Sequence, residues 1–289
     1  MANILLVGTA TLDIVYTLDH YPREDEEMRA QSLRMCRGGN AANTAVVLSR
    51  LGHACTFAGV LADAPETAVI VQDFARHGVD CSAAQRLPGR PPTSSIYLSE
   101  GRRTIVHYRD LPELRFEDFL AIDLTPFDWL HFEGRNVPEL LKMLCRVREL
   151  HPGIPLSLEI EKPRAGIEAL LSFPSLLIFS RAYAQARGFS QPFAFLQALA
   201  AQSPQADMVV GWGEAGAYAL GQDGAEFHSP AFPPPQIIDT LGAGDTFNAG
   251  LIDAHLRGAD RQDMLEAACR LAGRKCGMMG FGLEPVSHI

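Results

Sequence analysis

Several features that define whole classes of protein are missing from this sequence. No apolar run approaches the roughly 20 residues that a membrane-spanning helix needs. The apolar start, Met1 to Ala10, has no basic segment of the kind that a secretion signal carries. The six cysteines form no Cys-x-x-Cys pair and the nine histidines form no His-x-x-x-His pair, so neither a disulfide framework nor a zinc site is expected. We therefore expect a cytoplasmic protein with reduced thiols.

Positive charge is also scarce. The chain has 25 Lys and Arg residues against 34 Asp and Glu residues, a formal net charge of −9. This balance argues against the basic face that is typical of nucleic-acid-binding proteins. Any anionic ligand would have to be held by local groups against an unfavourable overall field. We expect small-molecule partners and neither nucleic acid nor membrane.

What the sequence does contain is an alternation of apolar runs with segments of helical periodicity. Continuous apolar runs lie at 4–8, 56–60, 129–132, 156–160, 176–179 and 208–211. Such runs are typical of parallel strands that are covered on both faces. Between two of them, apolar residues at 140, 141, 144 and 147 predict a helix from Pro138 to Leu150. The pattern predicts an α/β fold, with a doubly wound, mostly parallel central sheet flanked by helices in a single domain over 1–289.

Two polar regions, residues 11–36 and about 90–110, interrupt this alternation. They have no helical periodicity, and the second contains alternating stretches from Thr93 to Leu98 and from Thr104 to Tyr108. We interpret both as exposed β structure that forms a small β-sheet lid outside the main sheet. Plain edge strands would show the same alternation.

The most informative motif runs from Asp239 to Gly250 and reads Asp-Thr-Leu-Gly-Ala-Gly-Asp-Thr-Phe-Asn-Ala-Gly. Apolar positions 247, 251 and 254 predict a helix after the glycines, and the start of a helix offers unpaired N–H groups and a positive dipole end to an anion. Gly242 and Gly244 allow the backbone to approach a phosphate. Asp245 would lie beside that site, where a carboxylate can take a proton from a hydroxyl. Alternatively, Asp245 caps the helix and the glycines form a tight turn.

A second motif, Arg37 to Asn43, reads Arg-Gly-Gly-Asn-Ala-Ala-Asn and precedes a predicted helix that runs to about Leu51. Its glycine backbone and its two asparagine amides suit the hydroxyl groups of a sugar. An ordinary asparagine-capped helix would have the same appearance.

Together the two motifs resemble those of the ribokinase-like carbohydrate kinases. The resemblance implies that Asp245 is the catalytic base, and that the backbone of Gly242, Ala243 and Gly244 forms an anion hole for the transferring phosphoryl group. It also implies a sugar site that includes an aspartate at the end of the first strand, here Asp13. The implied sugar-binding residues are Asp13, Gly39, Asn40 and Asn43.

Further stretches resemble the ketohexokinases (hepatic-type fructokinases), a branch of that family, over nearly the whole chain. These stretches are 20–25, 103–106, 133–136, 161–164, 232–235 and 272–277. The resemblance implies phosphorylation of a ketohexose at its 1-hydroxyl, with Arg103 added to the sugar site. It also implies a homodimer joined through the lids, in which Asp25 reaches the sugar of the neighbouring subunit; a solvated charge run is the other interpretation of Asp25. Another ketose, a ribose-type sugar, a nucleoside or a 2-keto-3-deoxy sugar acid stays open as the acceptor, as does a non-catalytic sugar-binding protein.

The segment Gly-Trp-Gly-Glu-Ala-Gly at 211–216 spells the fingerprint of a dinucleotide site. That fingerprint requires a following helix, whereas residues 217–220 predict a strand and 221–224 a turn, so we reject an NAD site. The chain also lacks Gly-x-x-x-x-Gly-Lys-Ser/Thr, which excludes a P-loop kinase. The family resemblance implies instead that ATP lies along this loop. The implied nucleotide contacts are Trp212, Gly213, Glu214 and Gly216.

One departure from the family pattern concerns magnesium. Many ribokinase-like enzymes carry Asn-x-x-Glu after the strand that here ends at Phe179, but this chain has Arg181-Ala182-Tyr183-Ala184. Ketohexokinases also have a basic residue there, so we expect Arg181 to meet a phosphate. We expect Mg²⁺ to rest on ATP oxygens and waters, with no metal ligand from the protein; a requirement for K⁺ stays open. Asn136-x-x-Glu139 is interpreted as a chance match.

Overall fold

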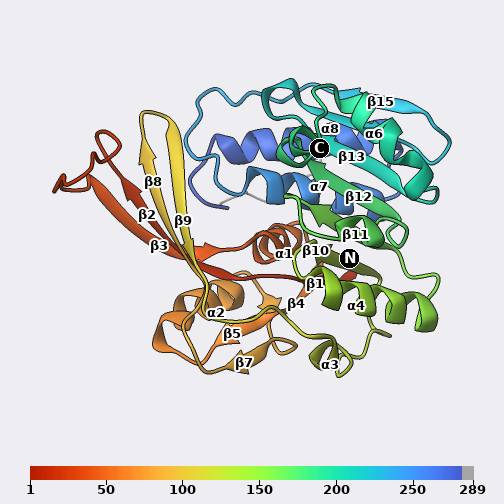
Figure 1. Ribbon diagram of the computed structural model, residues 1–289, viewed down its shortest axis with the longest axis horizontal. Coiled ribbons are helices and arrows are strands. Elements are labelled where there is room, and N and C mark those ends of the chain that lie inside the picture. Colours follow the sequence, from red (N-terminus) through yellow and green to blue (C-terminus); the bar gives the residue numbers. More distant parts are fainter. Residues whose placement is uncertain (282–289) are drawn as a thin grey trace.

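The structure is a computed structural model that describes residues 1–281, and its centre is a nine-stranded sheet (Figure 1). In spatial order the strands are β15 (Glu226–Ser229), β14 (Ala217–Leu220), β13 (Asp207–Gly211), β12 (Leu176–Ser180), β11 (Leu156–Ile160), β10 (Trp129–Glu133), β1 (Asn3–Val7), β4 (Ala54–Ala58) and β6 (Val79–Asp80). Neighbours from β13 to β6 are parallel, whereas β13, β14 and β15 pair antiparallel. The predicted doubly wound, mostly parallel sheet is confirmed.

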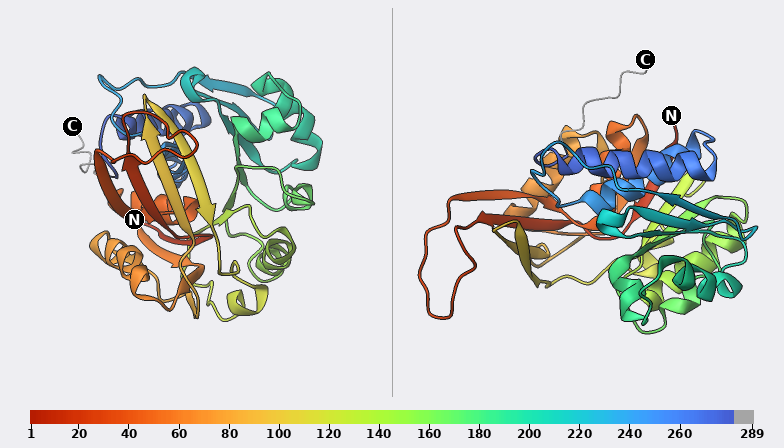
Figure 2. Two further views of the ribbon diagram at one scale, coloured as in Figure 1. Left: turned by 60° about the vertical axis from the view of Figure 1, so that its left-hand side comes forward. Right: turned by 90° about the horizontal axis from the view of Figure 1, so that it is seen from above.

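Helices cover both faces of this sheet because successive residues of a strand point to opposite sides. In β1, Ile4 and Leu6 enter one hydrophobic core and Leu5 and Val7 enter the other. The first core is closed by α1 (Asn40–Arg50), α2 (Ala68–Arg76), α7 (Ala243–Leu256) and α8 (Arg261–Cys276). The second is closed by α3 (Phe116–Phe119), α4 (Val137–Leu150), α5 (Arg181–Ala186) and α6 (Pro192–Leu199). Figure 2 shows these two helical layers from above.

The predicted strands and the predicted helix at 138–150 lie where expected, with one change. The run at 56–60 is divided, because β4 ends at Ala58 and β5 (Val60–Ala62) pairs with β7 (Gln85–Leu87) in a separate two-stranded sheet. Gly59 separates the two strands. A Cβ at this position would lie 2.4 Å from the carbonyl oxygen of Gly8, so only glycine allows this close approach.

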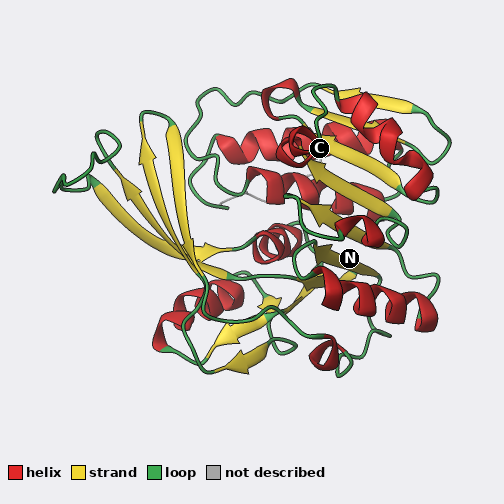
Figure 3. Cartoon of the chain, viewed as in Figure 1, coloured by secondary structure: helices red, strands yellow, loops and turns green. Residues whose placement is uncertain are grey.

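A smaller four-stranded sheet projects from the body of the molecule (Figures 1 and 3). Its strands are, in order, β3 (Ser32–Gly38), β2 (Thr11–Thr17), β8 (Thr93–Ser99) and β9 (Arg102–Tyr108). We call this the projecting sheet. All of its strand pairs are internal, with β2 parallel to β8 and both outer pairs antiparallel.

Short 3₁₀ turns at Pro65–Thr67, Ile167–Leu170, Ala200–Gln202 and Gly213–Ala215 complete the regular structure of residues 1–281. None of the helices in this part of the chain is both long and apolar enough to span a membrane.

Candidate active site

Three predicted site residues and two glutamates that were not predicted gather where the carboxyl ends of the central strands meet the first turns of α1 and α7. Glu133 ends β10 and Glu159 lies near the end of β11, while Asn40 and Asn43 begin α1 and Asp245 lies in the first turn of α7. In open α/β sheets this edge of the sheet is the usual ligand-binding position.

The glycine loop before α7 adopts a conformation that its sequence requires. Gly242 is the N-cap residue, with a left-handed φ of 77°. A Cβ on Gly242 would lie 2.3 Å from Cζ of Phe281, so any other residue would have to displace that ring. The amide of Ala243 makes a long 3.3 Å hydrogen bond to the carbonyl oxygen of Thr240. Within residues 1–281 the amides of Gly242 and Gly244 have no such partner, so they can meet an anion.

Asp245 does not cap the helix. It is the third residue of α7, and the helix start has no side-chain cap. Its Oδ2 instead accepts a 2.6 Å hydrogen bond from Nδ2 of Asn43, 202 residues away in the sequence. The capping interpretation of Asp245 is therefore wrong.

The environment of Asp245 is electrostatically unusual. The residue is only 8% exposed. Burial raises the pKa of the Asp245 carboxyl to about 7, and the nearby carboxylates Glu133 and Glu161 push it in the same direction, whereas the Asn43 hydrogen bond opposes the rise. A carboxyl that titrates near neutral pH is well matched to accept a proton from a hydroxyl.

Asp239, at the other end of the same loop, is surrounded by donors. Lys275, which is 0% exposed, donates to the Asp239 carbonyl oxygen at 2.7 Å and lies 3.4 Å from its Oδ2. Arg34 of β3 approaches Oδ2 at 3.4 Å, and the amides of Leu241 and Gly280 donate at 2.9 and 3.1 Å. Burial raises the pKa of Asp239, but these amides and cations outweigh it and hold the pKa below its ordinary value. The start of the glycine loop is thus fixed by an ionised carboxylate.

The two asparagines of the first motif also serve contacts between distant segments. The N-cap of α1 is Gly39, with φ 96°, and no side chain caps it. Asn40 donates to Oε1 of Glu159 at 3.1 Å and lies 3.4 Å from Oε2 of Glu161, while Asn43 binds Asp245. The asparagine-capped helix is therefore excluded.

Sequence reasoning gave Arg37 no role, although it opens this motif. The guanidinium of Arg37 is buried and donates to Oδ1 of Asn43 and, at 2.7 Å, to Oδ2 of Asp73 on α2. Arg37 thereby fixes the Asn43 amide so that its nitrogen points at Asp245.

We had expected Asp13 at the end of the first strand, but the structure places it elsewhere. The first strand stops at Val7, residues 8–10 cross to the projecting sheet, and Asp13 is the third residue of β2. Its Oδ1 accepts a 2.7 Å hydrogen bond from Oγ1 of Thr11, and burial raises the pKa of the Asp13 carboxyl. A Cβ on Gly38 would come within 2.1 Å of Oδ2, so the glycine of β3 makes room for this carboxylate.

Within one chain, the fold does not place Arg103 or Asp25 close to Asp13. Asp13 pairs with Ser94, which pairs with His107, whereas Arg103 is joined through Leu98 to Thr17. Arg103 is thus four residues along the strands from the level of Asp13, a separation of about 13 Å. Because four is an even number, Arg103 lies on the same face of the projecting sheet as Asp13, but near the tip of the sheet. His107 takes the position level with Asp13 and lies 3.2 Å from Oγ of Ser94. Asp25 lies in the exposed segment between β2 and β3, with φ 61°.

The loop after β13 contains the predicted nucleotide contacts. Gly213 to Ala215 forms a 3₁₀ turn and β14 follows at once, which agrees with the rejection of an NAD site. Trp212 is half-buried, and Gly216, with φ 87°, has no room for a Cβ because Ser229 O would lie 2.0 Å away. Glu214 is exposed.

Arg181, the first residue of α5, reaches this loop. A Cβ on Gly213 would lie 3.6 Å from Nη1 of Arg181, so the guanidinium lies directly against the loop. The first turn of α5 and the loop after β13, which the sequence analysis treated separately, are therefore adjacent, and Arg181, Gly213 and Glu214 are exposed.

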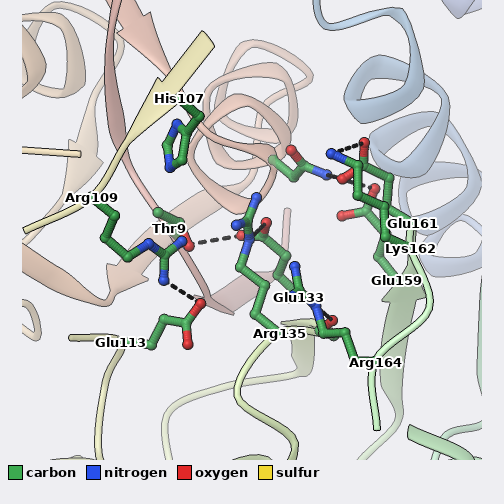
Figure 4. A network of polar contacts seen from close by, with 12 residues as sticks. Thr9, His107, Arg109, Glu113, Glu133, Arg135, Glu159, Glu161, Lys162 and Arg164 are labelled. Atoms are coloured by element: carbon green, nitrogen blue, oxygen red, sulfur yellow. Dashed lines mark hydrogen bonds and ion pairs between the residues drawn. The ribbon is translucent and has the colours of Figure 1, made fainter. Parts of the chain in front are cut away.

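Carboxylates and cations that sequence reasoning passed over lie around Glu133 (Figure 4). Glu133 accepts from the amide of Thr9 at 2.9 Å and pairs with Arg135. Glu161 lies 3.6 Å from Lys162. A signal for these residues was present in the sequence: each of the buried strands 129–133 and 156–160 has a glutamate at or next to its last residue. Such a pattern indicates a polar site at the edge of a sheet.

No group of three or more His, Cys, Asp or Glu residues within 1–281 is arranged to hold a metal ion. Asn136 and Glu139 serve the local structure of α4: Asn136 is its N-cap residue, and Glu139 accepts from the Phe116 amide at 2.7 Å and pairs with Lys142.

A doubly wound sheet with a small projecting sheet, and a buried carboxylate behind a glycine loop at a helix start, is the ribokinase-like architecture. Arabidopsis thaliana ribokinase, solved with ribose and ATP, superimposes with a TM-score of 0.81 at 21% identity over 96% of this chain and 94% of that one. A putative ribokinase from Agrobacterium tumefaciens gives a TM-score of 0.85 at 24% identity, covering 98% and 94%.

The chain belongs to the pfkB family of carbohydrate kinases, whose family model matches residues 1–285, and it is an ATP-dependent sugar kinase. Mouse ketohexokinase is 43% identical over 290 aligned residues, which cover 96% of this chain and 97% of the mouse protein. Ribokinase of Bacillus subtilis (strain 168) is 26% identical, with 98% and 95% covered.

Proposed function

We propose that this kinase transfers the γ-phosphoryl group of ATP to the 1-hydroxyl of a ketohexose such as fructose, with Asp245 as general base. The acceptor is supported by the 43% identity to mouse ketohexokinase. The chemistry is supported by one observation above all. Asp245 is buried beside the open amides of the Gly242 loop and its pKa is raised to about 7.

In the proposed reaction Asp245 accepts the proton of the sugar O1 while O1 forms a bond to the γ-phosphorus. The bond from that phosphorus to the β,γ-bridging oxygen breaks, and ADP leaves with the electron pair. The amides of Gly242, Ala243 and Gly244 and the positive end of α7 stabilise the equatorial phosphoryl oxygens. Asn43 keeps the carboxylate of Asp245 pointed at the acceptor oxygen.

We assign the sugar to the space between the projecting sheet and the first turn of α1. Asp13 faces it from β2, and Gly39, Asn40 and Asn43 face it from α1. Asp13 accepts hydroxyl protons and the asparagine amides offer donors and acceptors, which suits a polyhydroxylated neutral ligand.

We assign ATP to the loop Trp212–Gly216 and to Arg181, which lies against Gly213. The side chains near Asp245 offer no three-ligand metal group within the described residues, so Mg²⁺ would be held by phosphate oxygens and waters. When bound with ATP, the ion would neutralise part of the phosphate charge.

We further propose that 1–289 is one kinase domain, whose last eight residues lie outside the described part, and that the projecting sheet is its lid. The lid face turned away from Asp13 carries exposed apolar side chains on both edge strands. These are Leu33, Met35, Val106 and Tyr108. An exposed apolar patch on a sheet is typical of an interaction surface, and we propose a homodimer formed through it.

A homodimer of this kind would allow Asp25 to reach the sugar of the partner subunit. Light scattering should give twice the chain mass, and Met35→Asp should reduce it to the mass of one chain. A monomeric wild-type protein would remove Asp25 from the site.

The acceptor is tested by measuring ADP formation against a panel of ketoses, ribose, nucleosides and sugar acids, with the product phosphate position read by NMR. We expect the highest kcat/KM with a ketohexose and phosphate on O1. A preference for ribose or a nucleoside would overturn the acceptor and leave the role of Asp245 intact.

A further inference from the structure

Four carboxyl groups converge below the proposed sugar site, and two of them, Glu133 and Glu161, pair with a cation. Glu133 pairs with Arg135 and accepts from the Thr9 amide. Glu161 is half-buried beside Lys162, with which it forms an ion pair. Asp245 accepts from Asn43.

Glu159, the fourth, is different. It is 8% exposed, and its Oε1 accepts a 3.1 Å hydrogen bond from the Asn40 amide, while its Oε2 has no partner within residues 1–281. The neutral amide of Asn248, on α7, lies beside it and favours its charged form. No Lys, Arg or His in the described part of the chain forms an ion pair with Glu159, in contrast to Glu133 in Figure 4.

The charged groups that face Glu159 are themselves carboxylates. They are Asp245 of α7, Glu133 at the end of β10 and Glu161, which directly follows β11. The other two elements that meet Glu159 offer uncharged side chains, Asn40 of α1 and Ile178 of β12. The cations of this region, Arg135 and Lys162, are engaged by Glu133 and Glu161. A negative charge on Glu159 would therefore be buried, unpaired and repelled from three sides. Burial first, and then Asp245, Glu133 and Glu161, raise the pKa of Glu159 well above its ordinary value.

We propose that Glu159 works as a neutral carboxylic acid that positions the Asn40 amide and keeps a further negative charge away from Asp245. It is a positioning residue, since it acts through Asn40. The effect of Glu159 on catalysis rests on the proposed function, in which Asn40 binds the sugar. The protonated state of Glu159 does not depend on that function.

This role has a consequence on the alkaline side of the pH profile. As pH rises, Glu159 loses its proton, and the new charge repels both Asp245 and the phosphates of ATP. Activity should therefore fall at high pH in the wild type. A variant in which residue 159 cannot ionise should not show this fall.

Two variants, Glu159→Gln and Glu159→Ala, distinguish whether the side chain at position 159 acts as a neutral acid or as a carboxylate. Glutamine is neutral and keeps an oxygen that can accept from Asn40, so we expect kcat and sugar KM within about threefold of wild type and no alkaline fall. Alanine leaves Asn40 without this acceptor, and we expect sugar KM to rise about tenfold with a smaller change in kcat. A glutamine variant as impaired as the alanine variant would overturn the proposal, because both lack a carboxylate.

The infrared spectrum of the enzyme without substrates gives a second, independent measurement. A protonated carboxylic acid has a C=O stretch separate from that of carboxylates. At pH 8, above the titration of Asp245 near 7, the wild type should show this band, and Glu159→Gln should lack it. The surface variant Glu149→Gln is the matched control and should keep the band. Absence of the band in the wild type overturns the protonated state, whatever the acceptor sugar proves to be. The wild-type measurement also stands if a variant does not fold.

Discussion

The glycine loop before α7 has a buried aspartate at each end, and the two are electrostatic opposites. Asp239 is met by Lys275, Arg34 and two backbone amides, and its pKa lies below the ordinary 3.8. Asp245 is met by the Asn43 amide and by carboxylates, and its pKa rises to about 7. The same type of side chain is held as an anion at one end and titrates near neutral pH at the other, because cations contact only the first.

The largest expected effect is that of Asp245→Asn. The amide cannot accept the hydroxyl proton, so kcat should fall by about 10²- to 10⁴-fold, while ATP affinity changes little. Steady-state kinetics and calorimetric nucleotide binding measure the two quantities. Near-normal turnover would contradict the assignment of the base.

The next effect in size is that of Asp239→Asn, which should appear mainly as lost stability. Lys275 is fully buried and would lose the carboxylate beside it. Breaking a buried ion pair in this way costs about 3–5 kcal/mol in the free energy of unfolding, and the carbonyl that Lys275 retains should place the loss near the lower end. Urea denaturation measures it; Asp223→Asn, at an exposed carboxylate, is the control. A loss no larger than the control's would mean that Asp239 is not the anchor of the loop.

A smaller effect is expected from Gly242→Ala, which changes the loop between the two aspartates. The left-handed φ of 77° costs a non-glycine residue about 1–2 kcal/mol, and Phe281 must also move. We expect lower stability together with a higher KM for ATP, because the loop amides shift. Gly258→Ala, also at positive φ but with open space around it, should show the backbone cost alone. Equal effects on KM in the two variants would contradict a role for the Gly242 loop in phosphate binding.

The smallest effect, and the most direct comparison of the two ends, is in the pH dependence. Only ionised Asp245 can accept a proton, so kcat/KM should fall as pH decreases through about 7.

The two aspartates should affect the pH dependence of folding stability with opposite signs. The raised pKa of Asp245 favours the folded state at low pH, and this contribution is lost as pH rises from about 4 to about 7. The lowered pKa of Asp239 favours folding above its ordinary 3.8, and this contribution is lost as pH falls below that value.

Unfolding measurements on Asp245→Asn and wild type at pH 5 and pH 8 test this contrast. The variant should gain stability relative to wild type at the higher pH. A difference that does not change with pH would mean that Asp245 has an ordinary pKa in the folded protein.

Much of the fold was predictable from the sequence because apolar runs and helix periods are local properties. The strands at 129–133 and 156–160 and the helix at 137–150 are marked by their own residues. The glycines of 239–245 likewise predicted a loop at a helix start, because few residues other than glycine adopt that backbone.

Contacts between distant segments were not predictable in the same way. Asn43 and Asp245 are 202 residues apart, and their hydrogen bond depends on how α1 and α7 pack. The displacement of Asp13 into β2 and the place of His107 beside Ser94 follow from strand register, which no short window of sequence records. Glu159 was overlooked because a single glutamate in an apolar strand gives no sign of which charges will surround it.

The projecting sheet has a consequence for engineering. It completes its strand pairing internally, so its backbone hydrogen bonds would be retained if the whole sheet were exchanged. It carries Asp13 and His107, whereas the glycine loop and Asp245 belong to the body. The separation is incomplete, because β3 also supplies Arg34, which approaches Asp239, and Arg37, which fixes the Asn43 amide against Asp245. An exchange of segments 11–38 and 93–108, made to build kinases for new sugars, should therefore keep Arg34 and Arg37.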